Sequence, residues 1–121
     1  MLVDTSVLVN HIHVENEHLS ELFVGAAVSM HPFVFGEIAC GSIKDRKRVL
    51  GFLRKLPIVQ LATDSEVLQF IDRYSLMGKG IGYIDVHLLA SAAITAGTRL
   101  WSADRHLAGV AERLDLAYHP R

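Results

Sequence analysis

Four acidic residues of this chain stand in surroundings too apolar to hydrate a carboxylate easily. They are Asp4, Glu37, Asp85 and Asp104. Burying an unpaired carboxylate is costly, so each of these side chains needs hydrogen bonds, a proton or a nearby cation. Glu37 is the most informative of the four, because the apolar segment from Phe33 to Cys40 surrounds it and predicts that it is buried.

Each acid also has a simpler interpretation. Asp4, Asp85 and Asp104 stand where helices are expected to begin, and an aspartate there commonly caps free backbone N–H groups. Glu37 could instead form an ion pair with an arginine. If the fold brings all four together, however, their repulsion calls for a hard divalent cation with oxygen ligands, Mg²⁺ or Mn²⁺.

Short apolar segments that alternate with helical patterns position these acids. We expect strands in the residues before Asp4 and at 26–30, 58–61, 99–102 and, as a short edge, 116–119. We expect helices at 7–13, 15–25, 33–40, 44–56, 84–96 and 104–114, and another opened by a capping box at 63–66 and closed by Gly78.

This alternation predicts an α/β fold, with residues 1–121 forming a single domain. The expected architecture is an α/β/α sandwich around a parallel central sheet of four to five strands. In open sheets of this kind ligands bind beyond the carboxyl ends of the strands. Asp4 and Asp104 each follow an expected strand, and Glu37 and Asp85 lie on helices expected to pack nearby. The sequence therefore predicts a metal site at this edge.

The composition is that of a globular protein without a strong bulk charge. Half of the 121 residues are hydrophobic and the formal net charge is -1, so any contact with RNA or DNA must come from a local patch. Cys40 is the sole cysteine, which excludes an internal disulfide and fits a reducing compartment. No signal peptide is visible and no apolar run reaches the roughly 20 residues of a membrane helix, so we expect a soluble, cytoplasmic protein with no membrane association.

Four motifs occur in an order that resembles the PIN-domain ribonucleases of the VapC toxin type. They are Asp4–Val9, Phe33–Glu37, Gly82–Ala92 and Leu100–Leu107. The resemblance covers essentially the whole chain. It implies a PIN-like fold and a Mg²⁺- or Mn²⁺-dependent endoribonuclease, the toxin of a toxin–antitoxin pair. Such a toxin is held inactive by a cognate VapB-type antitoxin and is usually a homodimer.

Position by position, the resemblance makes the four acids the metal-binding and catalytic set. Ser6 and Ser102 match hydroxyl positions that orient the acids or water, while Thr5 is expected to cap the first helix. His106 stands where some PIN domains carry a further acid. The predicted reaction is in-line attack of water on an RNA phosphodiester, leaving a 5′-phosphate and a 3′-hydroxyl.

A basic run offers candidate contacts with the RNA backbone. Its members are Lys44, Arg46, Lys47 and Arg48. A solvated helix face is the simpler interpretation of such a run. The histidines do not have the spacing of a zinc-binding pair, which argues against a zinc site.

Two other functions compete with the nuclease. A phosphoacceptor receiver domain would need an aspartate at the end of its third strand, where this chain has Leu61-Ala62-Thr63. The stronger alternative is a non-catalytic PIN-like module that binds RNA or a protein. Retention of four costly acids argues against that alternative.

Overall fold

The computed structural model describes residues 1–120. In this part of the chain, helices predominate and two short strands are formed. Their order is β1 (Leu2–Val3), α1 (Thr5–His13), α2 (Glu17–Val24), α3 (Pro32–Cys40), α4 (Arg46–Leu53), α5 (Asp64–Tyr74), α6 (Tyr83–Ile94), β2 (Leu100–Trp101) and α7 (Arg105–Arg113).

The two strands pair in parallel, and three further extended segments attach to them through single bridges. Leu2 faces Leu100 and Val3 faces Trp101 across the β1–β2 pair. The isolated parallel bridges join Leu2 to Ser29, Met30 to Ile58 and Leu100 to Ala117. Across the sheet the order is therefore residue 58, residues 29–30, β1, β2 and residue 117. Successive segments of the chain are first added on one side of β1 and then, from β2 onward, on its other side, so the strand order reverses between β1 and β2.

The predicted parallel sheet is confirmed, but the predicted count of four to five strands is not. Within residues 1–120 only β1 and β2 pair over more than one residue. Pro32 and Pro57 flank the second and third extended segments, and a proline has no N–H with which to extend a ladder. Those segments therefore contribute bridges instead of strands.

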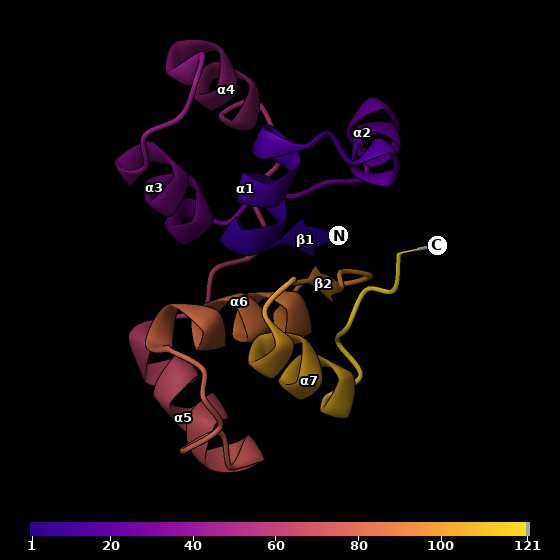
Figure 1. The fold of residues 1–121 in the computed structure, drawn as a ribbon. Helices are drawn as coiled ribbons and strands as arrows, with labels where there is room; N and C mark the ends of the chain where they lie inside the picture. Colours follow the sequence, from indigo (N-terminus) through magenta and orange to yellow (C-terminus); the bar gives the residue numbers. More distant parts are fainter. Residues whose placement is uncertain (121) are drawn as a thin grey trace.

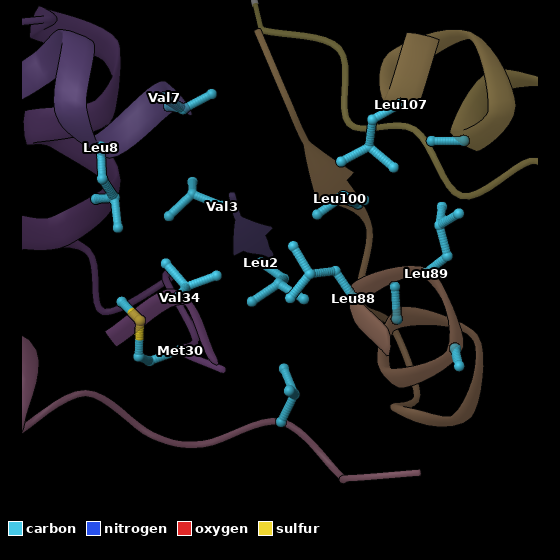
Figure 2. Packing of buried hydrophobic residues seen from close by; sticks show 14 of the residues in the cluster. Leu2, Val3, Val7, Leu8, Met30, Val34, Leu88, Leu89, Leu100 and Leu107 are labelled. Carbon is cyan, nitrogen blue, oxygen red and sulfur yellow. The ribbon is translucent and has the colours of Figure 1, made fainter. Parts of the chain in front are cut away.

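Helices cover both sides of this short sheet. Figure 1 shows α1 to α4 on one side of the β1–β2 pair and α5 to α7 on the other. In Figure 2, Leu2 and Leu100 lie near Leu88 of α6, while Val34 of α3 lies toward the opposite side. All four side chains are almost fully buried in one apolar cluster. This core fixes the positions of the strand ends.

Local signals placed several helices correctly. The capping box at the start of α5 is confirmed, because Glu66 N–H donates to Oγ1 of Thr63 and Thr63 N–H donates to Oε1 of Glu66. All residues from Val86 to Ala92 are buried, as predicted for α6. The predicted end of α5 at Gly78 is wrong, because Ser75 adopts a left-handed conformation with φ of 53° and stops the helix at Tyr74.

The helices of this fold are short. Over residues 1–120, none of them is long and apolar enough to cross a membrane.

Candidate functional site

Asp4 leaves β1 and caps α1 with its own side chain. It is only 5% exposed. Its Oδ1 accepts hydrogen bonds from the Ser6 hydroxyl at 2.5 Å and from Val7 N–H at 3.2 Å, and its Oδ2 accepts one from the Ser102 hydroxyl at 2.6 Å. Three donors thus compensate a buried carboxylate.

The two serines tie Asp4 to the turn that follows β2. Oγ of Ser6 accepts a hydrogen bond from Ala103 N–H at 3.0 Å, and Oγ of Ser102 accepts one from Asp104 N–H at 2.9 Å. Each hydroxyl therefore donates to Asp4 and accepts from the turn. The residues predicted to orient the acids lie where they can do so.

Asp104 caps α7 and is exposed. Its Oδ1 accepts hydrogen bonds from the N–H groups of His106 at 2.9 Å and Leu107 at 3.0 Å. These two bonds satisfy the free end of the helix, as the simpler interpretation of this residue predicts. Capping by one oxygen leaves the other oxygen available for a different partner.

Thr5 and Glu37 differ from their predicted roles. Thr5 was expected to cap α1, but Asp4 is the cap, and the Thr5 hydroxyl donates to Oε1 of Glu37 at 2.6 Å. Glu37 is exposed, so its predicted burial is wrong. The reason is that α3 is apolar nearly all round, while only Val34 and Ile38 of this helix are buried.

Asp85 lies in the first turn of α6, where its Oδ2 accepts a hydrogen bond from Gly82 N–H at 3.0 Å. Its pKa is raised from the usual range of an aspartate, first by burial and then by the negative charges of Asp4, Asp104 and Glu37. The hydrogen bond from Gly82 acts in the opposite direction. The three other acids thus lie close enough to Asp85 to destabilise its charged form.

The sheet topology explains why Asp4 and Asp104 lie at the same edge of the sheet. Asp4 and Asp104 follow β1 and β2, which are neighbours at the point where strand order reverses. Such a point is where open α/β sheets bind ligands. Both residues and Asp85 also stand at helix N-termini, whose free N–H groups favour negative charge.

The chemistry of this donor set fits a hard divalent cation such as Mg²⁺ or Mn²⁺, because all four side chains offer carboxylate oxygens. Oδ1 of Asp85 and Oδ2 of Asp104 accept no hydrogen bond from residues 1–120. In that same range, no three Asp, Glu, His or Cys side chains have the spacing of an assembled metal site. Side-chain rotation would therefore accompany binding of an ion.

The predicted RNA-contacting residues lie in α4 and just before it. Lys44, Arg46, Lys47 and Arg48 are all exposed, and Lys44 precedes α4 instead of lying in it. Lys44 and Arg48 line an open groove of about 630 Å³ between α1, α2 and α4. Arg46 donates to the carbonyl of Ala39 at 2.8 Å. Among the described residues, none of the four has an ion pair or a hydrogen bond with the acids.

Sequence reasoning missed a pair of buried histidines, His31 and His87. Nδ1 of His31 accepts a hydrogen bond from Phe33 N–H at 3.0 Å and so caps α3. The two imidazole rings are 6.3 Å apart, and neither Nε2 atom has a hydrogen-bond partner within residues 1–120. Nε2 of His87 lies 3.3 Å from Oδ1 of Asp64, without the alignment of a hydrogen bond.

Burial also governs the charge of His31. It lowers the pKa of His31 to about 4, with a smaller contribution from the positive charge of His87. The sequence marks each histidine separately, because His31 directly precedes a helix-initiating Pro32 and His87 interrupts an apolar helix.

Two comparisons with known proteins identify the family of the chain. The family model of the PIN domain matches residues 1–113. Ribonuclease VapC32 from two strains of Mycobacterium tuberculosis is 41% identical to this chain over 107 residues, which cover 88% of this chain and 86% of the relative.

Proposed function

This chain belongs to the PIN-domain family as a ribonuclease of the VapC type, and from that premise we propose that it is a metal-dependent endoribonuclease, the toxin of a toxin–antitoxin pair. One observation carries the metal dependence. Burial raises the pKa of Asp85, and the negative charges of Asp4, Asp104 and Glu37 raise it further, which supports a group of carboxylates that a divalent cation would stabilise.

The proposed ligands of Mg²⁺ or Mn²⁺ are the four acids, Asp4, Glu37, Asp85 and Asp104. When bound, such an ion activates water and stabilises the charge that develops on a phosphate. Ser6 and Ser102 hold both oxygens of Asp4 in place, and Thr5 orients Glu37. Water attacks the phosphorus in line, the bond to the 3′-oxygen breaks, and the products carry a 5′-phosphate and a 3′-hydroxyl.

The RNA substrate is proposed to contact the exposed basic residues through its phosphates. These residues are Lys44, Arg46, Lys47 and Arg48. We further propose a cognate VapB-type antitoxin as the inhibitory partner, a homodimer as the assembled form, and the cytoplasm as the place of action. These proposals follow from the kinship with VapC ribonucleases.

Cleavage assays test the proposed activity directly. The protein is incubated with a panel of structured RNAs in Mg²⁺, Mn²⁺ or EDTA, beside the variants Asp4→Ala and Asp85→Asn. We expect cleavage only with metal, and in neither of these two variants. Asp72→Asn is the matched control, since Asp72 is an exposed acid on α5 and should keep full activity.

The end groups and the binding data separate the alternatives. Cleavage that persists in EDTA, or in both active-site variants, would overturn the metal mechanism. A cyclic phosphate product would indicate attack by the RNA 2′-hydroxyl instead of water. RNA binding without any cleavage would favour a non-catalytic PIN-like module.

A further inference from the structure

A glycine in the loop before α6 leaves space that a side chain of α7 occupies. Gly80 has a positive φ of 76°, and a Cβ atom at this position would lie 2.8 Å from Cδ2 of His106. A Cβ atom so close would require the exposed imidazole ring of His106 to move. The imidazole ring of His106 therefore occupies the space that any side chain at position 80 would need, in addition to the backbone conformation that favours glycine.

His106 contacts the supports of two different acids. Its backbone N–H donates to Oδ1 of Asp104 at 2.9 Å, while its ring lies against Gly80. Two residues beyond Gly80, the N–H of Gly82 donates to Oδ2 of Asp85 at 3.0 Å. One residue thus connects the start of α7, where Asp104 lies, to the loop that holds Asp85.

The loop needs such an anchor because its backbone is permissive. Gly78 and Gly80 both have positive φ angles, and glycines have more conformations to lose on ordering than other residues. Ile81 packs against the core from the same loop. His106 provides a contact from α7, on the side of the candidate site.

We propose that His106 is a positioning residue: its ring packs on Gly80, orders the loop before α6 and thereby fixes the orientation of Asp85 relative to Asp104. This role rests on the proposed nuclease function, because it concerns the same site. It requires the shape of the ring and no proton transfer. A misplaced carboxylate lowers the catalytic rate even when substrate binding is kept.

Two alanine variants separate the ring contact from backbone strain. Gly80→Ala introduces both the collision with His106 and a residue with positive φ. Gly78→Ala places an alanine at a positive φ without any collision. Gly78 has a φ of 68°, and a Cβ atom added there would meet nothing within 4 Å. We expect kcat to fall about 10- to 100-fold in Gly80→Ala and at most about twofold in Gly78→Ala, with KM little changed in both.

Variants of His106 identify what the ring contributes. His106→Ala should lower kcat about tenfold, whereas His106→Phe, which retains a flat ring, should keep kcat within about threefold of wild type. In the His106→Ala background, Gly80→Ala should cost no more than Gly78→Ala, because the collision partner is gone. A His106→Phe variant as weak as His106→Ala would overturn a positioning role and indicate chemistry by the imidazole.

A readout independent of catalysis comes from NMR spectra of the metal-free protein. Gly80→Ala should shift the Gly82 amide and the His106 Cδ2–H resonances, and Gly78→Ala should leave both near their wild-type positions. Equal kcat values and equal Gly82 shifts in the two glycine variants would overturn the inference. If the wild-type protein cleaves no RNA, the proposed function fails, and the NMR comparison still decides whether His106 orders the loop.

Discussion

Two regions of the molecule differ in how their buried polar atoms are hydrogen-bonded: the acid region of Asp4, Glu37, Asp85 and Asp104, and the histidine region of His31 and His87. Asp4 is 5% exposed, and three donors address its two carboxylate oxygens. His31 and His87 are 2% and 4% exposed, but each leaves Nε2 without a hydrogen bond in residues 1–120. One region surrounds a charge with donors, whereas the other removes imidazoles from water among aromatic rings.

Both regions contain a group whose neutral form is favoured by burial. The pKa of Asp85 is raised and that of His31 is lowered to about 4. In each case neighbours of like charge increase the pKa shift that burial causes. These neighbours are three carboxylates around Asp85 and one imidazole beside His31. The difference lies in the remedy, because a cation can relieve the acids, while a neutral His31 already serves as the cap of α3. The comparison separates a charged site from a structural support.

The largest expected effect on RNA cleavage comes from a substitution of Asp4, the acid with the most hydrogen bonds. Asp4→Asn keeps the shape of the side chain but removes a negative charge and turns an NH₂ group toward a serine hydroxyl that now donates to Asp4. We expect RNA cleavage to slow roughly a thousandfold, or about 4 kcal/mol of transition-state stabilisation. Single-turnover rates with saturating Mn²⁺ measure it. A rate within tenfold of wild type would remove Asp4 from the catalytic set.

The histidine region is expected to lower the stability of the fold at acidic pH. As pH falls below about 6.5, the unfolded chain takes up a proton that folded His31 does not accept until its lowered pKa of about 4. Stability is therefore lost as pH falls through this window, by up to about 3 kcal/mol. His31→Asn retains an acceptor for Phe33 N–H and does not titrate, so it should flatten this loss.

Urea unfolding at about pH 7 and about pH 4.5 measures the effect on stability. His13→Asn serves as the matched control, since His13 is an exposed histidine at the end of α1. That variant should keep the wild-type difference between the two pH values. An equal loss in His31→Asn and wild type would assign the acid sensitivity to other groups.

The two regions also differ in how far the sequence could predict them. Asp4 and Asp104 were predictable because each follows a short apolar strand, and strand ends of a parallel sheet meet at one edge. The burial of Glu37 was predicted wrongly, because an apolar helix does not reveal which of its sides faces the core. The pairing of His31 with His87 joins residues far apart in the chain, and spacing alone gives no signal for it.

The fold shows the same limit. Local signals such as the Thr63–Glu66 capping box predicted the structure correctly, because all the interacting atoms lie within one turn. The number of strands was overestimated, since pairing length depends on partners elsewhere in the chain. The role of Thr5 as a donor to Glu37 depends likewise on how α1 packs against α3.

A smaller effect on cleavage is expected when a serine hydroxyl that donates to Asp4 is removed. Ser102→Ala removes the donor to Oδ2 of Asp4 and the acceptor for Asp104 N–H. We expect a roughly tenfold slower cleavage and a loss of about 1–2 kcal/mol in the free energy of unfolding. Ser102→Thr keeps the hydroxyl and should recover most of the activity. If the two variants behave alike, the hydroxyl is not what orients the acids.

The smallest expected effect is a change in the pKa of Asp85 when Glu37 is replaced. Among its neighbours, Glu37 contributes least to the raised pKa of Asp85, after Asp4 and Asp104. In metal-free protein, Glu37→Gln should therefore lower the pKa of Asp85 by less than Asp4→Asn does, as followed by NMR of the Asp85 carboxyl carbon. The same variant should leave the titration of His31 unchanged, because burial and His87, not Glu37, lower the pKa of His31. An Asp85 pKa that does not respond to Glu37→Gln would place Glu37 outside the charge cluster and remove it from the proposed metal ligands.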